Sequence, residues 1–153
     1  MDSTKDTLQH IDTVRRYLDI MIEVLLDRKK NHDASKLKEP EKSIFDQYSD
    51  NYRDKTYGND EYMKNLDNLK IALEHHYAEN RHHPQHFENG IQGMNLIDVC
   101  EMIADWKASS LRNSNGNIYK SIEICQERFG FGDELKQIFI NTALLYDEYD
   151  KKN

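Results

Sequence analysis

The sequence predicts an all-α protein that forms a single domain. Apolar residues recur at steps of three and four along most of the 153 residues, and no strand-like alternation extends beyond a few residues. The chain is 37% hydrophobic and 32% charged, a balance typical of a small protein whose helices each expose one face to water. A chain of this length can bury one sizeable core. We therefore expect one helical domain over residues 1–153, a bundle of about six or seven helices.

Apolar periodicity and proline divide the N-terminal half into helices and breaks. In residues 4–28 the apolar side chains share one helical face, and a break over 29–31 is expected to follow. Pro40 ends the next segment and suits the first turn of a helix. Glu39 and Glu41 are expected to form a first-turn charge pair that favours the helix dipole. The remaining expectations are a short segment over 32–37, a helix over 41–48, a polar loop over 49–60 and a helix over 62–80.

The C-terminal half begins with an irregular loop over 82–93, which contains proline and glycine. Asn95 is positioned as an N-cap, and Asp98 three residues later as its capping-box partner, so a helix is expected over 96–111. The further expectations are a turn over 113–117 and two helices, 118–128 and 133–149, separated by Gly130 and Gly132.

Charge and cysteine usage exclude several classes of function. The formal net charge is −7, whereas a protein that coats a nucleic-acid polymer neutralises phosphates with Lys and Arg. No apolar run is long enough for a membrane span, and residues 1–6 are too polar for a signal peptide, so we expect a cytoplasmic protein with no membrane partner. Cys100 and Cys125 form no CxxC pair and are expected to be small buried residues.

The seven histidines fall into three groups along the chain. His10 stands alone, His32 is followed directly by Asp33, and five more histidines lie within residues 75–86. Imidazole and carboxylate groups gathered from separate helices are typical ligands of transition metals. His32 and Asp33 can reach one cation only at a bend or a helix end, because neighbours inside a helix point about 100 degrees apart. The sequence therefore predicts a metal site with a bend at its His-Asp pair.

The helix before the histidine-rich loop contributes two adjacent histidines. His76 shares the buried face of this helix with Leu73, so it is favoured over His75 as a ligand. Asn80 is expected to cap the end of the helix, with substrate binding as the alternative.

The helix after the loop carries an acidic stripe formed by Asp98, Glu101 and Asp105. Apolar neighbours such as Met102 and Trp106 indicate that this helix is largely buried, and buried carboxylates need a partner or a metal.

The order of these motifs resembles the HD-domain superfamily of metal-dependent phosphohydrolases. Members are all-helical, and their ligands are a histidine, a His-Asp pair, one or more later histidines and a final aspartate. The resemblance covers roughly residues 8–110. The motifs that carry it are His10, HDASK at 32–36, HHYAENRHHPQHF at 75–87 and the aspartate of EMIADWKAS, Asp105, with Asp98 as the alternative. The chain also looks similar to small phage-encoded and bacterial proteins of unassigned function that share HDxSK and NxHHPxH elements.

This resemblance implies an HD-like fold and a divalent metal: Mn²⁺, Fe²⁺, Co²⁺ or Zn²⁺. The implied metal ligands are His10, His32, Asp33, His76, His83 and Asp105. The choice among His75, His76, His82, His83 and His86 stays open. The implied catalytic residues are Lys36 and Arg81, which would balance phosphate charge together with His82 or His83, and Glu101, which would orient water or a ligand imidazole. Asp98 is the alternative to Glu101 in that role.

The resemblance also implies a phosphorylated substrate. Position 77 is Tyr, where the cyclic-dinucleotide branch of the superfamily has a glutamate, so a nucleotide or a similar small phosphate ester is the expected class. Two alternatives remain: a catalytically silent HD-like module that binds a metal, a nucleotide or a partner, and a phage protein with a structural metal. The C-terminal helix, rich in tyrosine and acidic residues, could pack on the core or pair two chains into a homodimer.

Overall fold

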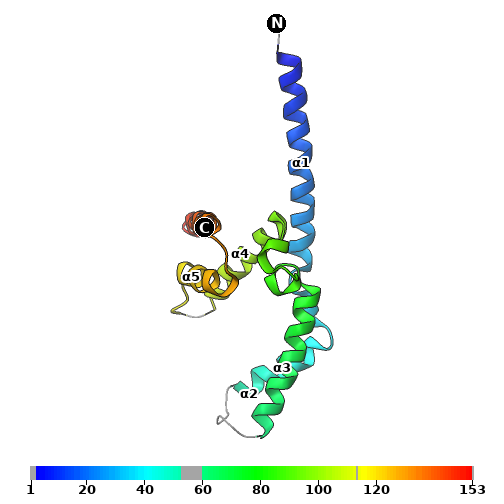
Figure 1. Ribbon diagram of the computed structural model, residues 1–153, viewed down its shortest axis with the longest axis vertical. Coiled ribbons are helices and arrows are strands. Elements are labelled where there is room, and N and C mark those ends of the chain that lie inside the picture. The colour runs from blue at the N-terminus through cyan, green and yellow to red at the C-terminus, as the bar shows by residue number, and fades with distance from the viewer. Residues whose placement is uncertain (1–2, 53–59, 113, 153) are drawn as a thin grey trace. The chain divides into compact units, whose positions relative to one another are not determined.

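The structure, a computed structural model, describes residues 3–52, 60–112 and 114–152 of the chain (Figure 1). Within these residues it contains six α-helices and three short 3₁₀ helices, and no strand. The predicted all-α class is confirmed, and so is the predicted number of helices. None of these helices combines the length and the apolar character that spanning a membrane requires.

The chain divides into two units, Met1–His32 and Asp33–Asn153, and each is described by itself. The first unit consists of helix α1 (Thr4–Asn31). The predicted break over 29–31 is wrong, because the helix continues to Asn31. Its last turn contains no glycine or proline and carries basic residues, which interact favourably with the negative end of the helix dipole.

A sharp bend follows α1 at the His-Asp pair. His32 has an extended backbone with φ −50° and ψ 125°, and Asp33 is left-handed with φ 55°. Among the described residues other than glycine, Asp33 alone has a positive φ, a conformation that most side chains avoid. The 3₁₀ helix η1 (Ala34–Leu37) starts directly after it. The bend predicted for a metal-binding His-Asp pair is therefore present.

The second unit contains the other helices at bounds close to those predicted. Helix α2 is longer than the predicted 41–48, since residues 49–52 of the expected loop are helical, and residues 53–59 of that loop lie outside the described residues. The elements are α2 (Glu41–Tyr52), α3 (Asp60–Glu79), η2 (Pro84–His86), η3 (Gly90–Gly93), α4 (Leu96–Ser110), α5 (Ile118–Phe129) and α6 (Asp133–Asp150).

Packing within the second unit brings the functional segments together. Helices α4, α5 and α6 contact one another around a core that includes Met102, Ile122 and Phe139, each no more than 1% exposed. Helix α2 packs along α3, and η1 contacts both. The chain around Asp33 therefore lies next to the C-terminal end of α3, where the histidine-rich loop begins.

The start of α4 has the predicted capping box. The Asn95 side-chain oxygen accepts hydrogen bonds from the backbone amides of Ile97 and Asp98, and the Asp98 carboxylate accepts one from the Asn95 amide at 3.0 Å. The predicted burial of both cysteines is wrong: Cys100 is exposed and Cys125 is half-buried. Cys100 is two residues from both Asp98 and Met102, so it points away from the buried face of the helix.

The loop between α3 and α4 is held in shape by close packing at Gly93. A Cβ atom at this position would lie 2.7 Å from the Cβ of Phe87, so a larger residue would displace the Phe87 side chain. Pro84, at the start of η2, is buried. The irregular loop predicted over 82–93 is therefore a packed segment built from two 3₁₀ turns.

Candidate metal centre

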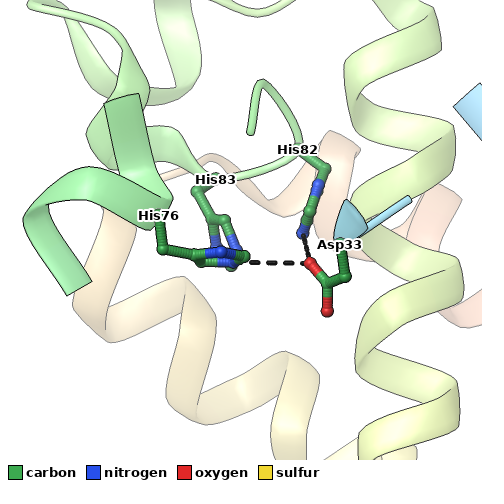
Figure 2. Close-up of side chains that lie close together, drawn as sticks. All are labelled: Asp33, His76, His82 and His83. Carbon is green, nitrogen blue, oxygen red and sulfur yellow. Dashed lines mark hydrogen bonds and ion pairs between the residues drawn. The ribbon is translucent and has the colours of Figure 1, made fainter. Parts of the chain in front are cut away.

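Four side chains of the second unit converge on one point. Asp33, His76, His82 and His83 each offer one ligand atom, and these atoms all lie within 4.8 Å of one another (Figure 2). Asp33 follows the bend after α1, His76 lies near the end of α3, and His82 and His83 open the loop that follows. These four residues are called the metal cluster below. The arrangement is of the kind that holds a divalent cation.

The spacing of the ligand atoms fits a single ion. Figure 2 shows His76 and His82 approaching the same oxygen of Asp33, and the distances from Asp33 Oδ1 to their Nε2 atoms are 3.4 and 3.5 Å. Ligand atoms about 2.1 Å from a tetrahedral ion lie about 3.4 Å from each other. The Nε2 atoms of His76 and His83 are closer, at 2.8 Å, and form a hydrogen bond. An ion would replace that bond by two coordination bonds after a small separation of the rings.

Glu41 orients His76 within the cluster. The Oε2 atom of Glu41 lies 2.9 Å from Nδ1 of His76, and the two residues are 0% and 2% exposed. A carboxylate at Nδ1 fixes the proton there, which leaves the lone pair of Nε2 directed at the other ligands. Burial lowers the pKa of His76, with Lys36 acting in the same direction, so the imidazole is held in its neutral, metal-binding form.

Glu41 is a residue of the candidate site that no motif in the sequence indicates. Glu41 lies in the first turn of α2, as expected, but it is buried, and its Oε1 also lies 2.7 Å from Nδ1 of His75. Burial raises the pKa of the Glu41 carboxyl, but hydrogen bonds with His75, Ser35 and His76 outweigh this effect and hold the pKa below its usual value. The spacing in sequence gives no signal for this contact, because 35 residues separate Glu41 from His76.

His82 is oriented in the same way by Glu101. Nδ1 of His82 lies 3.1 Å from Oε1 of Glu101, and Nε2 faces Asp33. The His82 side chain is 1% exposed and that of Glu101 10%. Metal-binding histidines commonly have a carboxylate on the second ring nitrogen. Glu101 therefore lies where it could orient the His82 imidazole, and its role remains a prediction.

Asp33 is positioned by its neighbour Lys36. The Nζ atom of Lys36 lies 2.6 Å from Oδ2 of Asp33, while Oδ1 faces the histidines. The left-handed backbone at Asp33 and the following 3₁₀ turn bring these two side chains together across three residues. Lys36 is partly exposed, and its ammonium group has N–H donors beyond the one directed at Asp33. The positive charge of Lys36 is therefore available to a ligand beside the cluster.

The pKa of His83 is strongly lowered. Burial, followed by the proximity of His82 and His76, lowers its pKa from 6.5 to about 3. Its ring centroid lies 4.1 Å from that of His82 and 5.0 Å from that of Tyr77. The imidazole is therefore neutral at physiological pH, as coordination requires.

Ser35 and Asn80 support the same region. The amide nitrogen of Asn80 donates to Oγ of Ser35 and to the carbonyl of His76, each at 2.8 Å. The expected capping role of Asn80 is thereby confirmed. Ser35 Oγ lies 3.2 Å from Nδ1 of His76, so η1 and the end of α3 are joined directly behind the cluster.

The remaining predicted site residues are placed as follows. His10 lies on α1 and His32 at its C-terminal end, both in the first unit, and their roles as ligands remain predictions. A carboxylate oxygen of Asp105 lies within 4.8 Å of a ring nitrogen of His82, close enough for Asp105 to reach the edge of the cluster.

Arg81 and Asp98 form a pair of their own. Nε and one terminal nitrogen of Arg81 donate to the two oxygens of Asp98 at 3.1 and 3.0 Å, and Asp98 is 0% exposed. Asp98 therefore combines this ion pair with its capping role. Of the two aspartates considered as the closing ligand, Asp105 is the one placed near the cluster.

His75 and His86 lie outside the metal cluster. His75 bonds to Glu41 and is half-buried, which agrees with the preference for His76 as the buried histidine. His86 shares a hydrogen bond of 2.9 Å between its Nδ1 and the carbonyl of Tyr77.

The fold and this cluster define an all-helical protein with a His/Asp cluster that could hold a metal ion. Comparison with known protein families identifies the family: the chain belongs to DUF5662, a family of unknown function, whose model matches residues 1–146. No HD-domain family model matches, so the resemblance to that superfamily rests on the motifs. No curated protein and no solved structure matches the chain.

Proposed function

We propose that the protein is a metal-dependent phosphohydrolase that acts on a small phosphate ester such as a nucleotide. The observation that carries this proposal is the metal cluster, in which ligand atoms of three imidazoles and one carboxylate lie within 4.8 Å of one another, close enough to surround one ion. Such a mixed set suits Mn²⁺, Fe²⁺, Co²⁺ or Zn²⁺. When bound, the ion supplies a Lewis acid that lowers the pKa of water and polarises a phosphoryl oxygen.

The residues around the cluster have the charges that hydrolysis of a phosphate ester requires. Glu41 and Glu101 hold His76 and His82 in the orientation for coordination. Lys36, beside Asp33, adds positive charge where the negative phosphoryl group would bind. Arg81 uses two of its nitrogens for Asp98, which leaves one terminal nitrogen for a substrate. Asp105 can accept a proton or a hydrogen bond at the edge of the cluster.

The number of protein ligands favours a second candidate function, in which the metal ion has a structural role. Four protein ligands complete the shell of a tetrahedral ion, and structural zinc sites are closed in this way. Ions that prefer six ligands, such as Mn²⁺, would leave two positions for water and substrate. The two candidates therefore differ in the geometry of the bound ion, and the absorption spectrum of a Co²⁺-loaded sample distinguishes tetrahedral from octahedral coordination.

The proposed activity is tested with p-nitrophenyl phosphate and a panel of nucleotides, in the presence of Mn²⁺ or Co²⁺. Two histidines that bracket Pro84 give a matched pair of variants, because His83 belongs to the metal cluster and His86 does not. We expect metal-dependent turnover in the wild type and in His86→Gln, and a loss of at least about 100-fold in His83→Gln. Metal binding without turnover of any phosphate ester, with tetrahedral Co²⁺, would support the structural site instead.

A further inference from the structure

A cavity adjoins the metal cluster within the second unit. It has a volume of about 280 Å³, and His83 and Asp105 are among the residues that line it. His83 is itself a member of the cluster, and Asp105 has an oxygen within 4.8 Å of a nitrogen of His82. A molecule held at the cluster can therefore extend into this cavity.

Aromatic side chains form much of the cavity wall. Tyr77, Trp106 and Phe129 all line it, and they come from α3, α4 and α5. The rings of Trp106 and Phe129 are nearly parallel, at 8° with centroids 6.2 Å apart. Three aromatic side chains in the wall favour a planar ring over a flexible chain, because ring contacts add to the burial of apolar area.

Polar and charged side chains around the cavity indicate how a ligand would be oriented. Asp105 and His83 are at the cluster, whereas Arg128 lines the cavity from α5. The guanidinium of Arg128 lies 4.9 Å from the ring centroid of Phe129, so it can also contact a ring bound against Phe129. The hydroxyl groups of Ser109 and Ser121 add hydrogen-bonding positions to the wall. This pattern suits a heteroaromatic ring with polar atoms at its edge.

We propose that this aromatic cavity binds the planar ring of the substrate's leaving group. The substrate class is then a phosphate monoester whose alcohol carries an aromatic or heteroaromatic ring, as a nucleoside monophosphate does. This inference rests on the proposed phosphohydrolase function. The volume of about 280 Å³ is close to the roughly 300 Å³ at which small-molecule pockets begin, a size that suits one ring system.

The reaction balances without another reactant. Water adds its oxygen to phosphorus, and the bond between phosphorus and the ester oxygen breaks. One proton from the water goes to the leaving oxygen, which gives the free alcohol and inorganic phosphate. The aromatic cavity acts by holding the ring of that alcohol, so its effect is expected in KM and in the choice of substrate.

Trp106 provides a direct readout, because it is the one tryptophan in the sequence and it lines the cavity. We would titrate its fluorescence with adenosine 5′-monophosphate, adenosine, ribose 5-phosphate and inorganic phosphate, in chelator and then with Mn²⁺. Binding of the two ring-containing probes should quench Trp106 even in chelator. With Mn²⁺, adenosine 5′-monophosphate should bind about tenfold or more tightly than ribose 5-phosphate, the contribution expected from stacking of one ring.

Variants of cavity residues test whether the quenching of Trp106 results from binding in the cavity. Ser109→Phe places a side chain at an exposed helical position that borders the cavity, and Ser121→Phe fills it from α5. Each should abolish quenching by adenosine while circular dichroism and metal binding are retained. If only one of the two variants folds, that variant is sufficient for the test. Arg128→Gln should weaken the binding of adenosine 5′-monophosphate about three- to fivefold. The control Arg112→Gln, another exposed arginine, should leave it unchanged.

Two results separate this inference from the proposed function. Equal affinities for adenosine 5′-monophosphate and ribose 5-phosphate, or unaltered adenosine binding in a folded Ser109→Phe variant, overturn the cavity assignment while metal-dependent hydrolysis can still stand. If the wild type binds no metal but adenosine quenches Trp106, and Ser109→Phe removes the quenching, the ring-binding cavity is supported and the phosphohydrolase proposal fails.

Discussion

The carboxylate of Glu41 lies 2.9 Å from Nδ1 of His76, and both side chains are almost completely enclosed by the protein. A buried glutamate is costly unless it is paired, and here its two oxygens reach two histidines. The opposite nitrogen of His76 faces Asp33 and His83. The pair thus connects the start of α2 to the metal cluster at the end of α3.

Substitution of Glu41 tests this support. Glu41→Gln keeps the shape of the side chain but removes the charge that fixes the proton on Nδ1 of His76. We expect metal affinity to fall about 10- to 100-fold, as is typical when a carboxylate behind a ligand histidine is lost. Isothermal titration with Mn²⁺ or Zn²⁺ measures the change. Glu39→Gln is the matched control, because Glu39 is exposed and bonds to Ser43. Equal affinities in the two variants would show that Glu41 has no part in the site.

Lys36 is expected to separate metal binding from substrate binding. In Lys36→Met the cation 2.6 Å from Asp33 is removed, so repulsion of a bound metal ion decreases. Metal affinity should be retained or should rise, whereas KM for a phosphate ester should rise about tenfold, because a charge-assisted contact is lost. Lys38→Met, at an exposed position nearby, is the control. A metal affinity that falls together with activity would mean that Lys36 acts only by holding Asp33.

The lowered pKa of His83 predicts a pH dependence of stability in metal-free protein. Its pKa is about 3 in the folded chain, against 6.5 for an ordinary histidine. Between these values the unfolded chain binds a proton at His83 that the folded chain does not, so the free energy of unfolding should fall as the pH falls through this window. Urea unfolding in chelator between pH 7 and 4 measures the slope. It should be smaller in His83→Gln than in His86→Gln; equal slopes would contradict the burial of a neutral imidazole at His83.

Two aspartates of α4 are expected to have different roles. Asp98→Asn weakens both the capping box and the bond to Arg81, and should lower the free energy of unfolding by about 1 to 3 kcal/mol with metal affinity little changed. Asp105→Asn should weaken metal binding or turnover with little effect on stability, since Asp105 lies close to His82 at the edge of the cluster. Thermal unfolding and metal titration of the two variants provide the comparison. The reverse pattern would make Asp98 the closing ligand.

Much of the fold follows from local signals in the sequence. The helices after Pro40 begin and end near the predicted residues, because proline, glycine and the Asn95 capping box act over a few residues. Helix α1 ends later than predicted, because residues 29–31 include no glycine or proline that would stop a helix. The apolar periodicity does not indicate the division of the chain at His32.

The candidate site was predictable only in part, because some of its residues lie in local motifs and others depend on contacts between distant segments. Recognisable motifs contain Asp33, His76 and His83, and the structure brings these three residues together. The sequence does not predict the contribution of His82, because spacing within an irregular loop does not determine which histidine turns inward. Glu41 depends on packing between α2 and α3, a contact between distant residues that no local pattern records.

The central claim is that Asp33, His76, His82 and His83 hold one divalent metal ion. Its most direct test is the metal content of purified protein by plasma emission, together with titration of chelator-treated samples, for the wild type, His82→Gln and His86→Gln. We predict about one ion per chain in the wild type and in His86→Gln, and loss of the ion in a folded His82→Gln variant. Failure of the wild type to retain or take up any divalent metal would contradict the claim, as would undiminished binding in His82→Gln.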